Sequence, residues 1–132
     1  MKKALIIKDD SLRTFSFRAR LRSFRFAFEG LYAFFSEQHN AIIHLVMTAF
    51  VFIAAIFFKI NKMEIIAVGL ATGFVWAAEL LNTAIEKLAD MVSKDFHPQI
   101  KFIKDVSAAA VFVAAISAFV TGVIVFVPKL FL

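Results

Sequence analysis

Several residue types are absent or rare in this chain of 132 residues, and each absence narrows the chemistry it can carry. Cysteine does not occur, which excludes a disulfide scaffold, an iron–sulfur cluster and a cysteine-rich zinc site. Only three histidines are present, so a metal site made of histidine alone would need all of them. The glycine-rich strings GxxxxGK[ST] and GxGxxG are both missing, which excludes a nucleotide enzyme of a standard soluble fold.

Apolar residues, by contrast, make up 61% of the chain, and the mean hydropathy is +0.83. Soluble globular domains average about 45–50% apolar residues, and disordered chains need low hydrophobicity. Long apolar runs lie within residues 41–58, 63–90 and 106–127. The last run has twenty-two residues without a charge; at ~1.5 Å per residue it reaches roughly 33 Å, enough to cross a membrane core of about 30 Å. The sequence predicts an all-α membrane protein of one domain, residues 1–132, with three transmembrane helices, the second extended into the cytoplasm.

Basic residues are concentrated in the arm formed by residues 1–40, which holds eight of the fifteen lysines and arginines. The segment 87–105 adds four, whereas the link 59–62 and the C-terminal tail together hold three. Since basic loops stay on the cytoplasmic side of a membrane, we expect the N-terminus and the second loop inside the cell and the C-terminus outside. A basic arm also suits nucleic acid, but the apolar runs that follow favour an anionic membrane face and no nucleic-acid partner.

Phenylalanine alternates with arginine in the second half of this arm. This composition is typical of an amphipathic helix in the membrane interface, with aromatic rings at the acyl boundary and arginines at the headgroups. The alternative is an anchor that only fixes the orientation of the chain. The phenylalanines are Phe15, Phe17, Phe24, Phe26, Phe28, Phe34 and Phe35.

Small residues recur at every fourth position in the second and third apolar runs. That spacing places them on one side of a helix, where two backbones can approach closely. The two sets together favour helix–helix packing, within one chain or between chains, although any single alanine is also explained as ordinary helix filler. The positions are Gly69, Gly73 and Ala77 in the second run and Ala110, Ala114, Ala118 and Gly122 in the third.

Three carboxylates and an amide share one side of the second helix where it leaves the membrane. At ~100° per residue they fall within a sector of roughly 80°: Glu79, Asn82, Glu86 and Asp90. Carboxylates on one stripe repel one another unless a cation lies among them, and an all-oxygen set suits Mg²⁺ better than zinc or copper. The alternative is a solvated helix end. That alternative explains Asp90 better than Glu79, which lies inside the apolar string WAAELL.

Two further positions lie at the same membrane boundary. Glu37 comes four residues before the first apolar run, and the helical hairpin would bring it near Glu86. The alternative for Glu37 is a helix-end charge among the headgroups. Lys104 and Asp105 precede the last run. The lysine suits a phosphate or a headgroup, and the aspartate suits either holding that lysine or binding a ribose hydroxyl.

Three strings, in this order, resemble the prokaryotic diacylglycerol kinase family, which includes the undecaprenol kinases: SEQHNAIIH, ELLNTAIEKLAD and HPQIKFIKDVSAAAV. The resemblance runs from about residue 23 to residue 128, and the pattern E-x-x-N-[ST]-A-x-E-x-x-x-D is long and specific. It implies an enzyme of the bacterial inner (cytoplasmic) membrane that transfers the γ-phosphate of ATP to a lipid hydroxyl with Mg²⁺. It also implies a homotrimer whose active sites are shared between neighbouring chains.

Carried over by position, the family pattern makes Glu79 the general base and places Asn82 in the active site. Its metal-binding carboxylates fall on Glu37 and Glu86. Its nucleotide contacts fall on Asp95, Phe96, His97, Lys104 and Asp105. The chain departs from the pattern at Glu29, Ile42 and Ala109, outside the carboxylate set, and these departures bear on headgroup contacts and lipid specificity.

The lipid itself stays open between diacylglycerol, whose product is phosphatidic acid, and a polyprenol such as undecaprenol. A different class of function is a non-catalytic membrane subunit or an element of a divalent-cation channel. A channel would place its acids at mid-membrane or in a ring, and a structural subunit has no use for Glu79 inside an apolar run. The gathering of acids at one level together with a lysine therefore favours the kinase.

Overall fold

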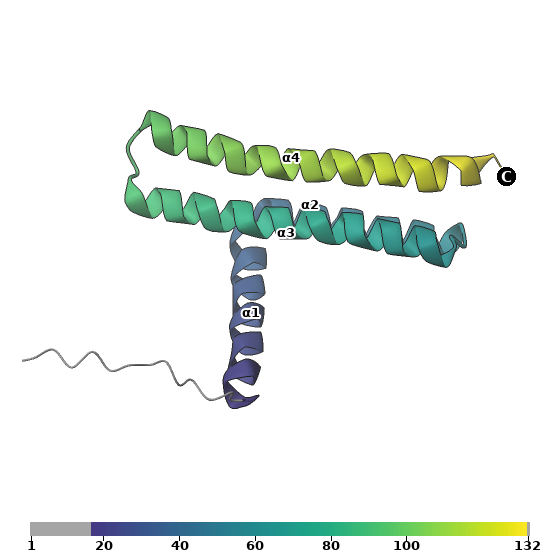
Figure 1. The fold of residues 1–132 in the computed structure, drawn as a ribbon, viewed down its shortest axis with the longest axis horizontal. Coiled ribbons are helices and arrows are strands. Elements are labelled where there is room, and N and C mark those ends of the chain that lie inside the picture. The colour runs from purple at the N-terminus through teal and green to yellow at the C-terminus, as the bar shows by residue number, and fades with distance from the viewer. Residues whose placement is uncertain (1–16, 132) are drawn as a thin grey trace, which may run out of the picture.

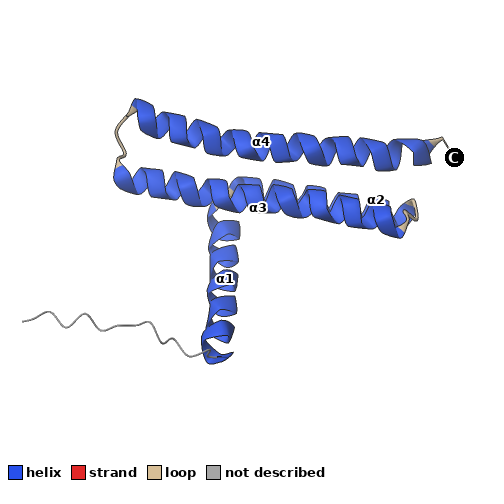
Figure 2. Ribbon diagram, viewed as in Figure 1, coloured by secondary structure: helices blue, strands red, loops and turns tan. Residues whose placement is uncertain are grey.

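The computed structural model of the protein describes residues 17–131 (Figure 1). No strand occurs within this range, and short connections join the helices (Figure 2). Phe15 and the rest of residues 1–16 lie outside the described residues. The elements are α1 (Phe17–Glu37), α2 (His39–Phe57), α3 (Lys62–Val92), α4 (Pro98–Phe126) and the 3₁₀-helix η1 (Val127–Leu130).

The three apolar helices lie alongside one another, and α1 stands crosswise to them (Figure 1). Three segments are long and apolar enough to cross a membrane, which confirms the predicted all-helical class with three spanning helices: Asn40–Phe57, Lys62–Val92 and Pro98–Leu130. Helices α3 and α4 pack along much of their length, whereas α2 touches α3 at fewer positions. Individual side-chain hydrogen bonds, such as those of His44 and Trp76, therefore join α2 to α3.

The helix that contains the third predicted span, residues 106–127, begins at Pro98. Proline suits the first helical turn, where its missing N–H leaves no intrahelical bond unmade. His97 caps this end, because its Nδ1 accepts a hydrogen bond from the backbone N–H of Gln99 at 3.2 Å. The connection 93–97 is consequently short, and we call this end of the bundle the loop end.

The opposite end is closed by a tight turn between α2 and α3. Lys59 adopts a left-handed backbone conformation with φ 48°. Asn61 then forms a capping box: its side chain accepts from the N–H groups of Met63 and Glu64 at 2.9 and 3.0 Å, and Glu64 accepts from the N–H of Asn61 at 2.7 Å. Glu64 also pairs with Lys129 at 3.1 Å, which fastens the start of α3 to η1. This closure sets the register in which α2 runs back along α3.

Few side chains of the described residues are buried, and most large apolar side chains are exposed. A water-soluble protein rarely exposes so much apolar surface, so lipid or other copies of the chain must cover it. The small residues of α3 and α4 differ in what surrounds them. Ala114 of α4 is fully buried within the chain, whereas a Cβ added at Gly73 of α3 would meet no atom within 4 Å.

Candidate active site

Glu79 is the buried carboxylate among the described residues, with 7% of its surface exposed. It lies on α3 within an apolar stretch of the helix, and its Oε1 lies 2.6 Å from Nε2 of His44 on α2. A carboxylate withdrawn from water is costly unless it is hydrogen-bonded. The imidazole of His44 supplies that partner across the gap between the two helices.

One turn nearer the loop end, an amide links α3 to α4. Asn82 donates from Nδ2 to Oε1 of Glu86 at 3.0 Å, and its Oδ1 accepts from the hydroxyl of Ser107 at 2.7 Å. Ser107 is buried, and the backbone carbonyl of Lys104, at 2.9 Å, is a second acceptor within reach of its single hydroxyl hydrogen. Both ends of the Asn82 amide are therefore engaged, which fixes its orientation toward Glu86.

Three further acids of the site pair with lysines. Lys104 contacts Asp90 at 2.5 Å, Lys101 pairs with Asp105, and Lys87 pairs with Glu37. Of the two roles that the sequence offers for Asp105, holding Lys104 is not what the structure shows. Consecutive side chains on a helix point apart, whereas positions four apart face each other, and Asp105 accordingly pairs with Lys101.

The predicted nucleotide-contacting residues of the second loop lie in the connection between α3 and α4. The backbone N–H of Asp95 donates to Oγ of Ser93 at 3.1 Å. Phe96 is 80% exposed, and His97 caps α4 through Nδ1. Lys104 and Asp105 lie near the start of α4, shortly after this loop. The loop joins α3 to α4 at one end of the bundle (Figure 1).

The donor set for a divalent cation is incomplete in one chain. The described residues contain no group of three or more histidine, aspartate or glutamate side chains placed to hold a metal. Mg²⁺ does not require such a cage, because it commonly binds one or two carboxylates together with substrate phosphates and water. Glu37 contacts Lys87, the residue that follows Glu86, so α1 brings its carboxylate to the same level of α3 as Glu86. Consecutive side chains on a helix point apart, and the two carboxylates are therefore near in level without sharing a site in the structure. Both are oxygen donors of the kind that Mg²⁺ takes.

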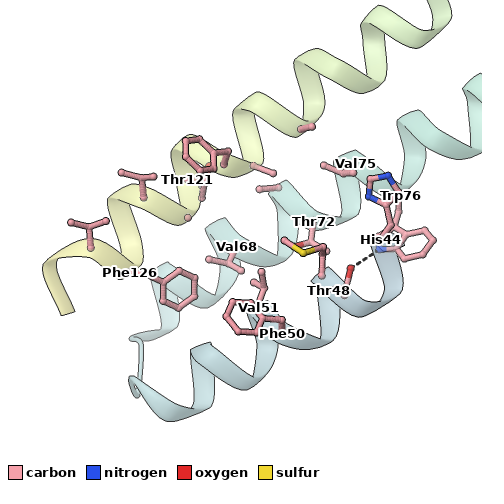
Figure 3. Close-up of a pocket in the computed structure, with 18 residues that line it drawn as sticks. His44, Thr48, Phe50, Val51, Val68, Thr72, Val75, Trp76, Thr121 and Phe126 are labelled. Carbon is pink, nitrogen blue, oxygen red and sulfur yellow. Dashed lines mark hydrogen bonds between the residues drawn. The ribbon is translucent and has the colours of Figure 1, made fainter. Parts of the chain in front are cut away.

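An apolar groove of about 460 Å³ lies between α2, α3 and α4. Its size is within the range of about 300–1,000 Å³ found for ligand pockets. His44, Thr48 and Trp76 lie together at one end of the groove, and Phe126 lies toward the other (Figure 3). Trp76 donates from Nε1 to Oγ1 of Thr48 at 3.0 Å. His44 thus borders the groove on one side and contacts Glu79 on the other.

Comparison with known proteins places this arrangement in a family. Residues 25–126 match the prokaryotic diacylglycerol kinase family. The chain belongs to that family. It is 35% identical over 111 residues to the diacylglycerol kinase of Synechocystis sp. and 32% identical over 109 residues to the undecaprenol kinase of Bacillus subtilis. Each alignment covers 83% of this chain; they cover 63% of the Synechocystis protein and 89% of the Bacillus protein.

Membership confirms the resemblance drawn from the three sequence strings. The prokaryotic diacylglycerol kinase family is a family of membrane lipid kinases, and a kinase takes its phosphoryl group from a nucleotide co-substrate. The three spanning helices agree with a membrane enzyme. Both relatives named above are kinases of lipids, one of diacylglycerol and one of undecaprenol.

Two residues of this family member were not singled out for a role by the sequence. His44 is noticeable only as a polar interruption of an apolar run, because its partner Glu79 lies 35 positions away. Ser107 lies within the string HPQIKFIKDVSAAAV, where nothing in the sequence gives it a role of its own. A polar residue facing inward on an apolar helix is the signal that would have identified both, since buried polar groups require partners.

Proposed function

We propose that the chain transfers the γ-phosphoryl group of ATP to the hydroxyl of a membrane lipid, with diacylglycerol as acceptor and phosphatidic acid as product. The observation that carries this proposal is the buried carboxylate of Glu79. His44 joins it to the apolar groove on one side, and the hydrogen-bonded side chains of Asn82, Glu86 and Ser107 follow toward the loop end. A base at the boundary between an apolar channel and a phosphate-binding surface suits a reaction in which one substrate is a lipid and the other is water-soluble. Undecaprenol is the second candidate acceptor, supported by the identity with the Bacillus undecaprenol kinase.

In this proposal Glu79 accepts the proton of the lipid hydroxyl. The O–H bond breaks as the oxygen attacks the γ-phosphorus, and the bond from that phosphorus to its bridging oxygen breaks in line. ADP leaves with the electron pair of that bond. Phosphoryl transfer depends chiefly on positioning and on cancellation of phosphate charge. Lys104 supplies positive charge, and Asn82 positions the carboxylate of Glu86 through its hydrogen bond. The nucleotide is bound by Asp95, Phe96, His97 and Asp105.

Glu37 and Glu86 would hold Mg²⁺ in this scheme. When bound, the ion would neutralise charge on the ATP phosphates. In the structure these two carboxylates are held by Lys87 and Asn82 respectively. The exposed Lys87 side chain can turn away when Glu37 binds a cation. Asn82 can stay hydrogen-bonded to Oε1 of Glu86, which leaves the second oxygen of that carboxylate for the ion.

The test of this function is a phosphorylation assay in mixed micelles with purified protein, labelled ATP and Mg²⁺. Diacylglycerol and undecaprenol are offered side by side at equal mole fraction. We expect labelled phosphatidic acid as the main product. If undecaprenyl phosphate dominates, the acceptor is undecaprenol and not diacylglycerol. The absence of any labelled lipid would refute the kinase assignment for this chain.

We further propose that the protein lies in the bacterial cytoplasmic membrane with its N-terminus and its loop end in the cytoplasm, on the distribution of basic residues. Single cysteines in this cysteine-free chain test that orientation. Lys62→Cys and Lys94→Cys are suitable because both positions are exposed and neither side chain caps a helix. We expect a membrane-impermeant thiol reagent to label Lys94→Cys only from the cytoplasmic side and Lys62→Cys only from outside. Labelling of both from one side would refute the three-span topology.

The proposed assembly is a homotrimer with active sites shared between neighbouring chains. The exposed apolar surface and the open face of α3 at Gly73 support contacts between copies. Complementation of two inactive variants tests the sharing. We mix Glu79→Gln chains with Glu37→Gln chains under conditions that exchange subunits. If the two side chains of one site come from different chains of a ring, about a quarter of the sites regain both carboxylates. If mixing restores no activity although the subunits have exchanged, Glu37 and Glu79 of one site come from the same chain.

A further inference from the structure

We propose that His44 is a positioning residue that holds the carboxylate of Glu79 in the orientation needed to accept the lipid proton. The inference rests on the proposed function, in which Glu79 is the base. Nε2 of His44 lies 2.6 Å from Oε1 of Glu79, across 35 positions of sequence and between two different helices. The side chain of Glu79 is 9% exposed and that of His44 is 25% exposed, so little water competes for this contact.

The direction of the hydrogen bond follows from the state of the base. A carboxylate ready to accept a proton is ionised, and an ionised carboxylate is an acceptor only. Nε2 of His44 therefore carries the hydrogen and donates it to Oε1. This leaves Oε2 of Glu79 for the lipid hydroxyl. Charge-assisted hydrogen bonds are shorter and stronger than neutral ones, and the short Nε2–Oε1 distance fits that class.

The imidazole of His44 is itself held in place. Its ring packs edge-on against Trp76, with ring centroids 6.1 Å apart. Trp76 in turn hydrogen-bonds Thr48, one helical turn from His44 on α2. Phe34 and Phe35 at the end of α1 pack on the same indole, with centroids at 6.2 and 5.5 Å. Rigid support of this kind is what holds a catalytic group within the narrow geometry that turnover requires.

Under the proposed function, the lipid acceptor would reach Glu79 from the apolar groove. His44 borders the apolar groove, whereas Glu79 is not among the residues that line it. A hydroxyl entering from the groove would thus meet the imidazole before or together with the carboxylate. His44 is therefore placed to set both the orientation of Glu79 and the side from which the hydroxyl approaches.

Two substitutions at His44 test the proposal in the mixed-micelle assay. His44→Leu removes the donor, and we expect kcat to fall about 10- to 100-fold, the usual cost of losing a hydrogen bond to a charged group. The KM for ATP should change less than about twofold, because nucleotide binding lies at the loop end. His44→Gln restores an amide N–H donor at similar reach, and we expect it to recover most of kcat. A leucine variant with the kcat of the unsubstituted chain, or a glutamine variant as slow as leucine, would overturn the positioning role.

A double-mutant cycle separates positioning from a merely structural role. If His44 acts through Glu79, His44→Leu should cost little more once Glu79→Gln is present, since groups in contact are not additive. A full additional loss in the double variant would contradict the proposal. His44→Gln keeps the test decisive if His44→Leu does not fold, as judged by thermal unfolding in detergent. If the unsubstituted chain phosphorylates no lipid, the proposed function fails; if it is active and His44→Leu is equally fast, only the positioning role fails.

Discussion

Glu79→Gln is expected to slow turnover about 10²–10⁴-fold, the usual contribution of a general base. The amide keeps the size and shape of the carboxylate but cannot accept the proton of the lipid hydroxyl. MgATP binding should stay within about a factor of two, because seven residues of helix, roughly 10 Å, separate Glu79 from Glu86. The measurements are kcat from labelled lipid and ATP affinity from calorimetry on the detergent-solubilised protein.

The matched control for this variant is Glu64→Gln, the same chemical change on the same helix. Glu64 lies at the opposite end of α3, where it pairs with Lys129 and closes the capping box with Asn61. A glutamine also serves in a capping box, so this variant should fold and turn over at the unsubstituted rate. If Glu79→Gln is as active as Glu64→Gln, the buried carboxylate of Glu79 has a structural role only and is not the base.

Glu86→Gln is expected to weaken the apparent Mg²⁺ affinity in the presence of ATP by about 10- to 100-fold. Losing a residue that only supports a metal ligand already weakens metal binding by about that much. Saturating Mg²⁺ should recover part of the activity, since the reaction step itself keeps its base. The hydrogen bond from Asn82 can persist with the amide oxygen of the new side chain, so the local fold should be preserved.

Titrating Mg²⁺ against both variants distinguishes the two roles. Raised Mg²⁺ should help Glu86→Gln and leave Glu79→Gln slow. The opposite pattern would exchange the assignments, with the deeper carboxylate on the cation and the shallower one on the proton. Rates near that of the unsubstituted chain in both variants would leave the acidic stripe as a solvated helix end.

The helical class was predictable because uninterrupted apolar runs have few alternatives to spanning helices. Glu79 was predictable as a functional carboxylate because it interrupts an apolar run, where an ionisable group is costly. Its role as base came from the family resemblance and stays a prediction. The contact of Glu79 with His44 was not predictable, since it depends on the register between two helices that the turn at Lys59 and Asn61 sets. The partner of Lys104 was also beyond the sequence, because Asp90 reaches it from the neighbouring helix.

The pairing of lysines with aspartates at the loop end changes how charge-removing variants must be interpreted. Lys104 and Asp90 are partly exposed and lie in contact. Removing Lys104 takes away one positive charge and simultaneously releases an unneutralised carboxylate toward an incoming triphosphate. The measured loss of ATP affinity would then combine missing attraction with new repulsion. Only Lys104→Met combined with Asp90→Asn leaves the electrostatic balance of the surface unchanged and reports the contact of the ammonium with the nucleotide alone.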